Sequence, residues 1–555
     1  MRESFRFCLL STMRVPHLLA PALSLVLLPA MAGEVLYNGI VLPESWPPND
    51  SIEAFKNREP QPVPYLKQPP AVIPVDLGRQ LFVDDFLIES TTLQREFHLA
   101  EMHPLNPVVK PDLPTEAEGK LPMAMVFSDG VWFDPHDRLF KMWYLAGYGK
   151  QTALATSRDG LRWEKPIFDV RAGTNVVQTE PRDSSTVWLD QEDPDPARRF
   201  KMWRAHSEDK HYGLSLHYSA DGVHWGPRVL RTGWHSDRST VFWNPFRKVW
   251  VYSMRHGWGF PRTRRYMEVK DLAASPAWKE IPEQPIWLAA DKLDPPREDL
   301  QVEPQLYNFD AVAYESLMLG LFTIWRGDLN IPPGRPKPNT VCLGFSRDGF
   351  HFDRPDRRPF IPVSEKQGDW NWGNVQSAGG GCLIVGDQLW FYFSGRAGSS
   401  DGKTRDGHGA TGIAVLRRDG FASMNAAASG GALTTRLLTF SGKHLLVNAA
   451  ATGGELRAEV LDRDGQVIEP FTKENCEPVR TDSTRVEVRW KGVEDLSAIA
   501  KRPVRLRFSL SKGSLFAFWI AADRGGASRG YVAAGGPAFD GPTDTAGANA
   551  AASRQ

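Results

Sequence analysis

One short motif recurs along this chain and decides its fold: ATSRDGLRW at 155–163, YSADGVHW at 218–225 and FSRDGFHF at 345–352. A weaker copy, LRRDGF, lies at 416–421, and a degenerate one lies at Asp271-Leu272. Asp-Gly between apolar segments is a strong signal for a tight turn between antiparallel strands. The five turns are 50 to 77 residues apart, about the length of a four-stranded sheet with its connections.

An aromatic-rich strand precedes every turn. The five copies are FKMWY (140–144), FKMWR (200–204), VWVY (249–252), LGLFTIW (319–325) and LWFYF (389–393). Small antiparallel sheets that repeat in this way close most simply into a radial β-propeller, which leaves only short, protected edges. The sequence therefore predicts an all-β protein with a five-bladed β-propeller over residues 76–428.

The segments outside the repeats have different compositions. Arg2, Arg6 and Arg14 precede a short apolar run and a small-residue site ending at Ala32, which is typical of a signal peptide. We therefore expect residues 1–32 to be removed and the protein to be secreted or periplasmic. The expected regions outside the propeller are a Pro-rich N-terminal extension (33–75), a small C-terminal β-sandwich (429–522) and a disordered Gly/Ala-rich tail (523–555).

The charge and the cysteines exclude several classes of function. With 66 basic and 66 acidic side chains, the chain has no electrostatic attraction for nucleic acid or an anionic membrane, so we expect neither as a partner. Three cysteines remain after the signal peptide, an odd number without metal-ligand spacing. Neither a metal nor a cofactor is expected.

Polar residues open the predicted inner strands, which converge on the axis of a propeller. DSSTV begins at Asp183 in the second blade, DRSTV begins at Asp237 in the third, and YNFDAV places Asp310 in the fourth. Carboxylates brought together from different strands are what cleavage of a glycosidic bond requires. We expect these three acids to face the axial cavity.

Arginine closes the second strand of four blades. These residues are Arg204, Arg255, Arg326 and Arg396. Antiparallel pairing places them beside the acids and predicts an Asp/Arg ring that binds substrate. The alternative is that each pair, such as Asp183 with Arg204, is an ion pair within one blade. Trp234, Trp258 and Trp372 lie in polar loops where sugars could stack.

Arg396 has no obvious acidic partner at the adjacent strand start; the alternative is that it pairs with Asp369 or Asp401 from nearby loops and is structural. Guanidinium groups bind carboxylate and sulfate with paired hydrogen bonds. This favours an anionic carbohydrate, such as a uronic acid or a sulfated sugar, as the ligand.

A family resemblance lies in QLFVDDFLIE at 80–89, NPV at 106–108, the aromatic strands and the Asp-Gly turns. These segments resemble bacterial secreted proteins grouped with glycoside hydrolase family 32. They are also similar to the wider five-bladed clan of invertases, levansucrases and arabinanases, over about residues 71–425. The resemblance implies that Asp84 or Asp85 is the nucleophile, since only one of two adjacent residues can face the axis. It further implies a transition-state role for Arg182-Asp183 and an acid/base role for Glu315, with Glu303 behind it. The invertase signatures WMNDPNG and ECP are absent.

These observations predict a secreted glycoside hydrolase that acts on an oligo- or polysaccharide. The alternative is a non-catalytic carbohydrate-binding propeller, and a protein-interaction scaffold is a third hypothesis. The fold alone does not separate them, because propellers host many functions.

Overall fold

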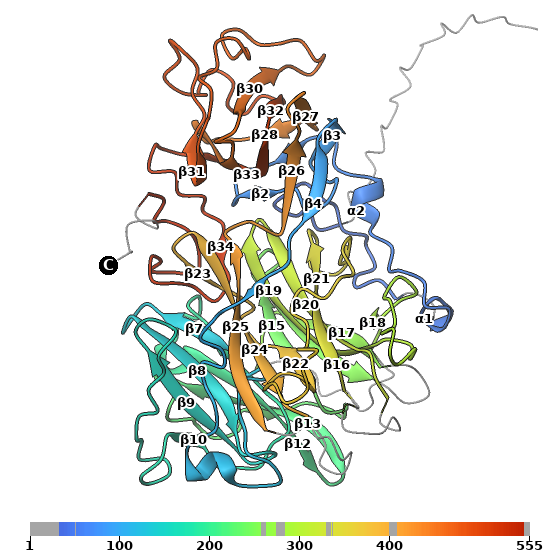
Figure 1. Cartoon of the computed structure of the whole chain (residues 1–555), viewed down its shortest axis with the longest axis vertical. Coiled ribbons are helices and arrows are strands. Elements are labelled where there is room, and N and C mark those ends of the chain that lie inside the picture. The colour runs from blue at the N-terminus through green and yellow to red at the C-terminus, as the bar shows by residue number, and fades with distance from the viewer. Residues whose placement is uncertain are drawn as a thin grey trace, which may run out of the picture.

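The computed structural model describes residues 33–49, 52–256, 262–273, 284–328, 335, 337–398 and 408–548 (Figure 1). The predicted signal peptide lies outside these residues. Helices are confined to α1 (Ile52–Lys56), α2 (Pro64–Lys67) and two 3-10 turns at Pro114–Ala117 and Pro196–Arg198 in the part of the chain described. Within that part, no helix is long and apolar enough to cross a membrane.

Five antiparallel sheets follow one another along the chain and form a β-propeller. Sheet 1 holds β6 (Ala124–Met125), β7 (Val131–Asp134), β8 (Leu139–Ala146), β9 (Gln151–Ser157) and β10 (Val176–Gln178). Sheet 2 holds β11 (Ser185–Leu189), β12 (Phe200–Glu208), β13 (His211–Ser219) and β14 (Leu230–Arg231). Sheet 3 holds β15 (Thr240–Asn244), β16 (Val249–His256), β17 (Thr263–Val269) and β18 (Ile286–Ala289).

The last two sheets each borrow a strand from a distant part of the chain. Sheet 4 holds β19 (Gln305–Glu315), β20 (Leu317–Trp325), β21 (Asn339–Ser346) and the C-terminal β34 (Tyr531–Val532). Sheet 5 holds β22 (Asn374–Ser377), β23 (Leu383–Val385), β24 (Gln388–Arg396), β25 (Gly409–Arg417) and the N-terminal β5 (Glu101–Met102). Because β5 pairs with β25, the chain before sheet 1 completes sheet 5 and fastens the two ends of the propeller together.

The repeated Ser-x-Asp-Gly turn owes its residues to a local hydrogen-bond pattern. In sheet 1, the Ser157 hydroxyl accepts from the amide of Gly160 at 2.8 Å, and the Asp159 carboxylate accepts from the amides of Leu161 and Arg162 at 2.8 Å. Gly160 has a φ of 73°, in the region that favours glycine. The turns of sheets 2 and 4 repeat these bonds.

The same turns join neighbouring sheets. The indole of Trp143 in sheet 1 donates to the carbonyl of Gly222 in the turn of sheet 2 at 2.8 Å. The hydroxyl of Tyr392 in sheet 5 donates to the carbonyl of Gly160 in sheet 1. Trp203 takes the place of Trp143 in sheet 2, where the next turn is the degenerate Asp271-Leu272. Its buried indole N–H has no acceptor among the residues described, which is the structural consequence of the lost repeat.

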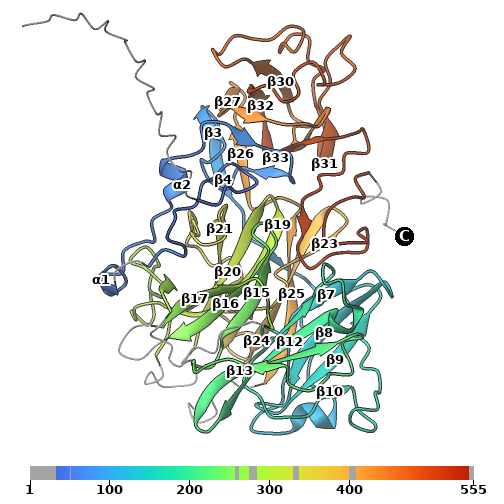
Figure 2. The same ribbon diagram turned by 180° about the vertical axis from the view of Figure 1, so that it is seen from behind.

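A second group of sheets, the C-terminal region, has its own hydrophobic core and lies at one end of the propeller (Figures 1 and 2). Its larger sheet contains β31 (Asp482–Glu487), β29 (His444–Ala450), β33 (Gly513–Ala521), β26 (Ala422–Ala426), β4 (Gln94–Phe97) and β2 (Gln80–Leu81). Its smaller sheet contains β3 (Ile88–Thr91), β27 (Gly431–Thr435), β32 (Arg505–Ser511) and β30 (Glu455–Leu461), and β1 (Ile73–Pro74) pairs with β28 (Leu438–Thr439).

This arrangement corrects two predicted boundaries. Residues 80–97, expected at the start of the propeller, supply β2, β3 and β4 to the C-terminal region, because their apolar side chains join its core. The expected disordered tail is wrong for residues 523–548. Val532 and Phe539 are buried against the propeller, and β34 extends sheet 4, so a few apolar anchors hold this small-residue segment in place.

Candidate active site

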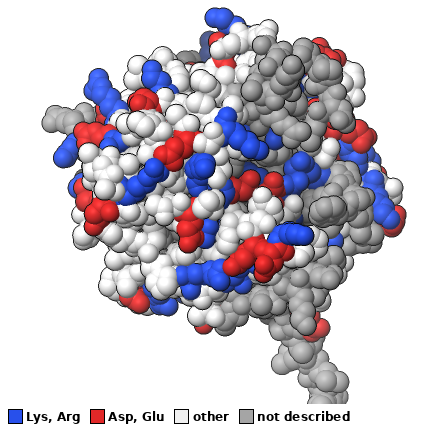
Figure 3. Space-filling view, turned by 90° about the horizontal axis from the view of Figure 1, so that it is seen from below, with Lys and Arg blue, Asp and Glu red and all other residues white. Residues whose placement is uncertain are grey.

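The candidate site lies where the inner strands begin, at the end of the propeller away from the C-terminal region. The opposite end of the inner strand β19 is marked by Glu315, which bonds to Ser528 and Arg418 near that region. Figure 3 looks at the molecule from the free end and shows basic and acidic side chains close together around a recess. The starts of the inner strands lie toward this end of the propeller.

Arg238 crosses the centre of the propeller. It precedes β15 in sheet 3, yet its guanidinium lies 3.9 Å from the ring centroid of Phe127, which is between β6 and β7 of sheet 1. Its Nη2 donates to the Ser128 hydroxyl at 3.4 Å, while Nε and Nη1 have no hydrogen-bond partner among the residues described. Its side chain is fully buried. A buried guanidinium with free N–H groups is costly unless an acceptor is supplied.

Asp310 is a buried carboxyl on the inner strand of sheet 4. Its Oδ2 accepts from the Asn308 amide at 2.7 Å and from the Ser377 hydroxyl at 2.5 Å, and the Ser128 hydroxyl is a further hydrogen-bond partner of the carboxyl. Burial raises the pKa of Asp310 above its ordinary value, although the hydrogen bonds from Ser377 and Ser128 and the charges of Arg238 and Arg264 oppose the rise. A fixed carboxyl with a raised pKa suits a proton donor.

Asp129 and Arg182 form a buried ion pair beside the axis. Two guanidinium nitrogens of Arg182 lie 3.0 Å from the two carboxylate oxygens of Asp129, and both side chains are inaccessible to solvent. Burial raises the pKa of Asp129 to about 6, against the charges of Arg182 and Arg238. The pair connects the entry of sheet 1 to the entry of sheet 2.

Asp183 and Asp237 occupy the entries of sheets 2 and 3, on adjacent inner strands as the repeated motif predicted. Asp183 is half-buried, and its carboxylate accepts no hydrogen bond from any described residue. It lies within electrostatic reach of Arg182, Arg238 and Arg255. Asp237 instead forms an ion pair with Arg255. Asp183 is thus the carboxylate most available to a ligand.

The predicted Asp/Arg ring is only partly formed. Asp237 pairs with Arg255 as expected, but Arg204 pairs with Glu180 and not with Asp183. Arg204 also donates to the carbonyl of Pro181 at 2.9 Å, which holds its guanidinium beside the chain segment that carries Glu180. The Arg204–Glu180 pair is a contact at the edge of the cavity.

Two further arginines are buried in the wall. Arg326 donates to the Thr340 hydroxyl and to the Pro295 carbonyl, so it points into sheet 4 and does not belong to the ring. Arg396 lies 5.5 Å from the ring centroids of both Phe127 and Tyr148. Its position at the entry of sheet 5 keeps it close to Arg238.

The three predicted tryptophans differ in their surroundings. Trp234 is half-buried, with its ring centroid 5.6 Å from that of His211. Trp372 lies beneath the guanidinium of Arg335 at 5.0 Å. Trp258 lies outside the described residues. Of these three, Trp234 stands nearest in the chain to the entry of sheet 3.

The acids that the family resemblance implied as catalytic do not lie at the candidate site, so that expectation is wrong. Asp84 is buried and its two carboxylate oxygens accept from Arg347 at 2.8–3.1 Å, while Asp85 is exposed and pairs with Arg95. Both precede sheet 1 by some forty residues in sequence and lie beside the C-terminal region. Glu315 ends β19 and is fully buried between Arg79 and Arg418, at the far end from the cavity.

Sequence reasoning missed Asp129, Arg238, Arg264 and Tyr307. Arg264 is fully buried and donates to the backbone carbonyls of Arg238 and Tyr307. The only available signal was that Arg238 stands inside the second copy of the D-x-S-T-V motif. Among the described residues, no group of three or more His, Cys, Asp or Glu side chains is placed to hold a metal ion.

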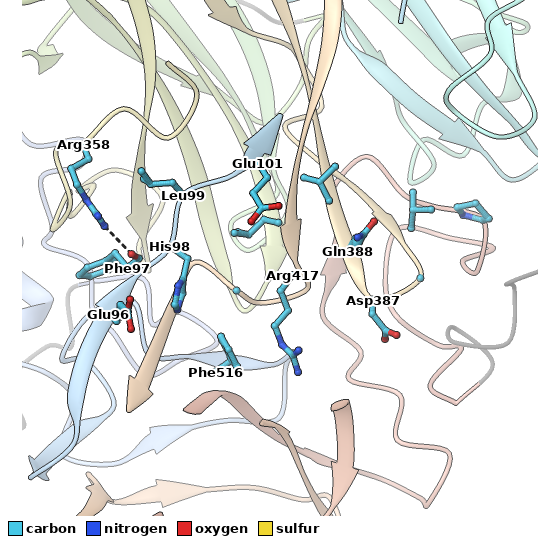
Figure 4. A pocket seen from close by; sticks show the side chains of 16 residues that line it. Glu96, Phe97, His98, Leu99, Glu101, Arg358, Asp387, Gln388, Arg417 and Phe516 are labelled. Atoms are coloured by element: carbon cyan, nitrogen blue, oxygen red, sulfur yellow. Dashed lines mark hydrogen bonds between the residues drawn. The ribbon is translucent and has the colours of Figure 1, made fainter. Parts of the chain in front are cut away.

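A large crevice of about 1020 Å³ lies elsewhere, between sheet 5 and the C-terminal region (Figure 4). Phe97, His98 and Phe516 line one part of it, and Arg358 donates to the backbone carbonyl of Phe97 at 2.8 Å. None of the predicted site residues that the structure describes lines this crevice.

No protein-family model and no curated protein sequence matches the chain. Solved structures that are similar to this chain include a thermostable family-43 glycoside hydrolase. It shares 11% identity, with a TM-score of 0.38, over 54% of this chain and 93% of its own. A fructofuranosidase from Schwanniomyces occidentalis complexed with fructosylnystose shares 10% identity over 76% of this chain and 98% of its own, with a TM-score of 0.33.

A third similar structure comes from the GH130 family of mannoside phosphorylases, which contains glycoside hydrolases that target β-1,2 mannosidic linkages. It shares 12% identity over 61% of this chain and 96% of its own, with a TM-score of 0.35. These three TM-scores are all below 0.5.

Proposed function

We propose that the protein is an exported glycosidase whose five sheets are the blades of a five-bladed β-propeller and whose C-terminal region is a β-sandwich. The pairing of β5 with β25 supports the blade count, because it closes the fifth sheet on the first. The two sheets around a separate hydrophobic core support the sandwich. The signal-like residues 1–32 support export.

One observation carries the proposed activity: two carboxyl groups in contrasting environments belong to the inner strands of different blades, with Asp183 just before β11 and Asp310 within β19. Asp310 is held by Asn308 and Ser377 and has a raised pKa. Asp183 is half-buried and has no side-chain donor among the described residues. Glycosidic cleavage needs two such carboxyls, one protonated and one ionised.

The chemistry follows from these differences. Asp310 donates its proton to the glycosidic oxygen as the bond from that oxygen to the anomeric carbon breaks. Asp183 supplies the second carboxylate, which either attacks the anomeric carbon or removes a proton from the attacking water. Arg238 lies within electrostatic reach of both acids and stabilises their negative charge as the proton moves.

We propose further that the carbohydrate is anionic. Two buried cations near the axis lack an ion-pair partner: Arg182, Arg204 and Arg255 have acidic partners, whereas Arg238 and Arg264 form no ion pair among the described residues. A substrate with an acidic group would balance this buried positive charge.

The test is a screen of neutral, uronic-acid and sulfated glycans in water enriched in ¹⁸O, with products analysed by mass spectrometry. A glycosidase places one ¹⁸O at the new reducing end. The Asp310→Asn variant should lose this product and still bind the glycan. Saturable glycan binding without any labelled product would instead identify a non-catalytic carbohydrate-binding propeller.

A further inference from the structure

A cationic corner lies between sheets 3 and 4, beside Tyr307. The guanidinium of Arg262 lies 5.1 Å from the ring centroid of Tyr307 and 4.7 Å from that of Trp325. The ammonium of Lys337 lies 5.8 Å from the Tyr307 ring. Two aromatic rings thus hold the Arg262 guanidinium in place by its flat face, leaving its N–H edge to meet a ligand.

Arg262 differs from the other arginines at the cavity entrance. Arg204 and Arg255 each have an acidic partner, Glu180 and Asp237. Arg262 has no carboxylate within ion-pair distance in the described part of the chain, and the only hydrogen bonds of the residue are made by its backbone. It is partly exposed, so that a ligand can reach it.

Tyr307 is the second component of the corner. Its side chain is 7% exposed, and its hydroxyl makes no hydrogen bond to any described residue. Burial alone would raise the pKa of Tyr307, but Lys337, Arg396, Arg238 and Arg262 together outweigh burial and lower the pKa below its ordinary value. Four cations therefore act on this one hydroxyl and stabilise negative charge there.

We propose that Arg262 and Tyr307 form an anion subsite that binds the acidic group, a carboxylate or a sulfate, of the substrate sugar. The subsite rests on the proposed function in taking a carbohydrate, and it assigns the recognition of charge to residues other than Asp183 and Asp310. The guanidinium edge and the tyrosine hydroxyl donate to the oxygens of the acidic group. Arg238, deeper on the axis, adds attraction through its free N–H groups.

Sulfate and acetate ions are the probes, because they carry the two acidic groups without a sugar. Choline chloride keeps the ionic strength constant. Titration of Tyr307 is followed by tyrosinate absorbance near 295 nm, as the difference between the wild type and Tyr307→Phe. Binding of either ion should saturate and shift the titration of Tyr307 to higher pH, because the bound anion offsets the four cations.

The Arg262→Gln variant should weaken the binding of the better ion at least tenfold. Arg358→Gln is the control, since Arg358 is exposed, pairs with Asp356 and lies at the crevice near sheet 5. Saturation by sulfate alone or acetate alone identifies the acidic group. Equal affinity in Arg262→Gln, or no saturable effect of either ion, overturns the subsite.

The same measurements separate this inference from the proposed activity. Saturable ion binding that depends on Arg262, with no glycan cleaved, leaves the subsite standing and refutes the glycosidase. Cleavage of a neutral glycan, at a rate equal to that of its acidic counterpart, leaves the glycosidase standing and refutes the subsite.

Discussion

Neighbouring residues Asp84 and Asp85 should respond very differently to the same substitution. Asp84 and Arg347 are almost wholly buried, at 0% and 1% side-chain exposure, and share several hydrogen bonds. Asp85 is 71% exposed in its pair with Arg95. Asp84→Asn leaves a buried guanidinium without its counter-charge, which costs about 3–5 kcal/mol. Asp85→Asn should change the free energy of unfolding by less than about 0.5 kcal/mol.

The assay is thermal unfolding with both variants at the same pH and salt. A loss of this size lowers Tm by about 3–5 °C for Asp84→Asn in a chain of 555 residues, and Asp85→Asn stays within about 1 °C of the wild type. The double variant Asp84→Leu with Arg347→Met should recover most of the loss, since it removes both buried charges. Equal Tm values for the two single variants would refute the assignment of Asp84 as a structural ion pair.

Two other outcomes follow from the structure. Burial raises the pKa of Asp129 from 3.8 to about 6, so the folded state holds this proton more tightly, and the contribution of Asp129 to stability is present below pH 4 and is lost as pH rises to 6. In urea unfolding, the difference in unfolding free energy between the wild type and Asp129→Asn should therefore fall by about 3 kcal/mol over this range, and parallel profiles would contradict it. Trp143→Phe should destabilise the fold about 1–3 kcal/mol more than Trp203→Phe, because only Trp143 has an acceptor for its indole N–H, and equal losses would show that the Gly222 bond contributes nothing.

The sequence predicted the repeat well because its signals are local. Ser157, Asp159 and Gly160 bond to one another within a few residues, so their pattern is readable without knowledge of the fold. The entry positions of Asp183 and Asp237 followed from the same repeat. The Asp237–Arg255 pair confirms that strand pairing brings these positions together.

The misplaced residues depend on contacts between distant segments. Asp84 is held by Arg347, which is 263 positions away, and no local pattern distinguishes such a pair from a catalytic acid. The ordered segment around Val532 is similar, because its few apolar anchors pack against residues of sheet 4. Arg238 reaches from sheet 3 to Phe127 near sheet 1, a contact that only the closed propeller creates.

The most direct measurement of the central claim is the rate of glycan cleavage by Asp183→Asn and Asp310→Asn, with Asp85→Asn as the matched control. On a glycan that the wild type cleaves, each axial substitution should lower kcat by about 10²–10³ while Tm stays near that of the wild type, and Asp85→Asn should keep full activity. Wild-type rates in both axial variants, or loss of activity in Asp85→Asn at unchanged Tm, would contradict the account.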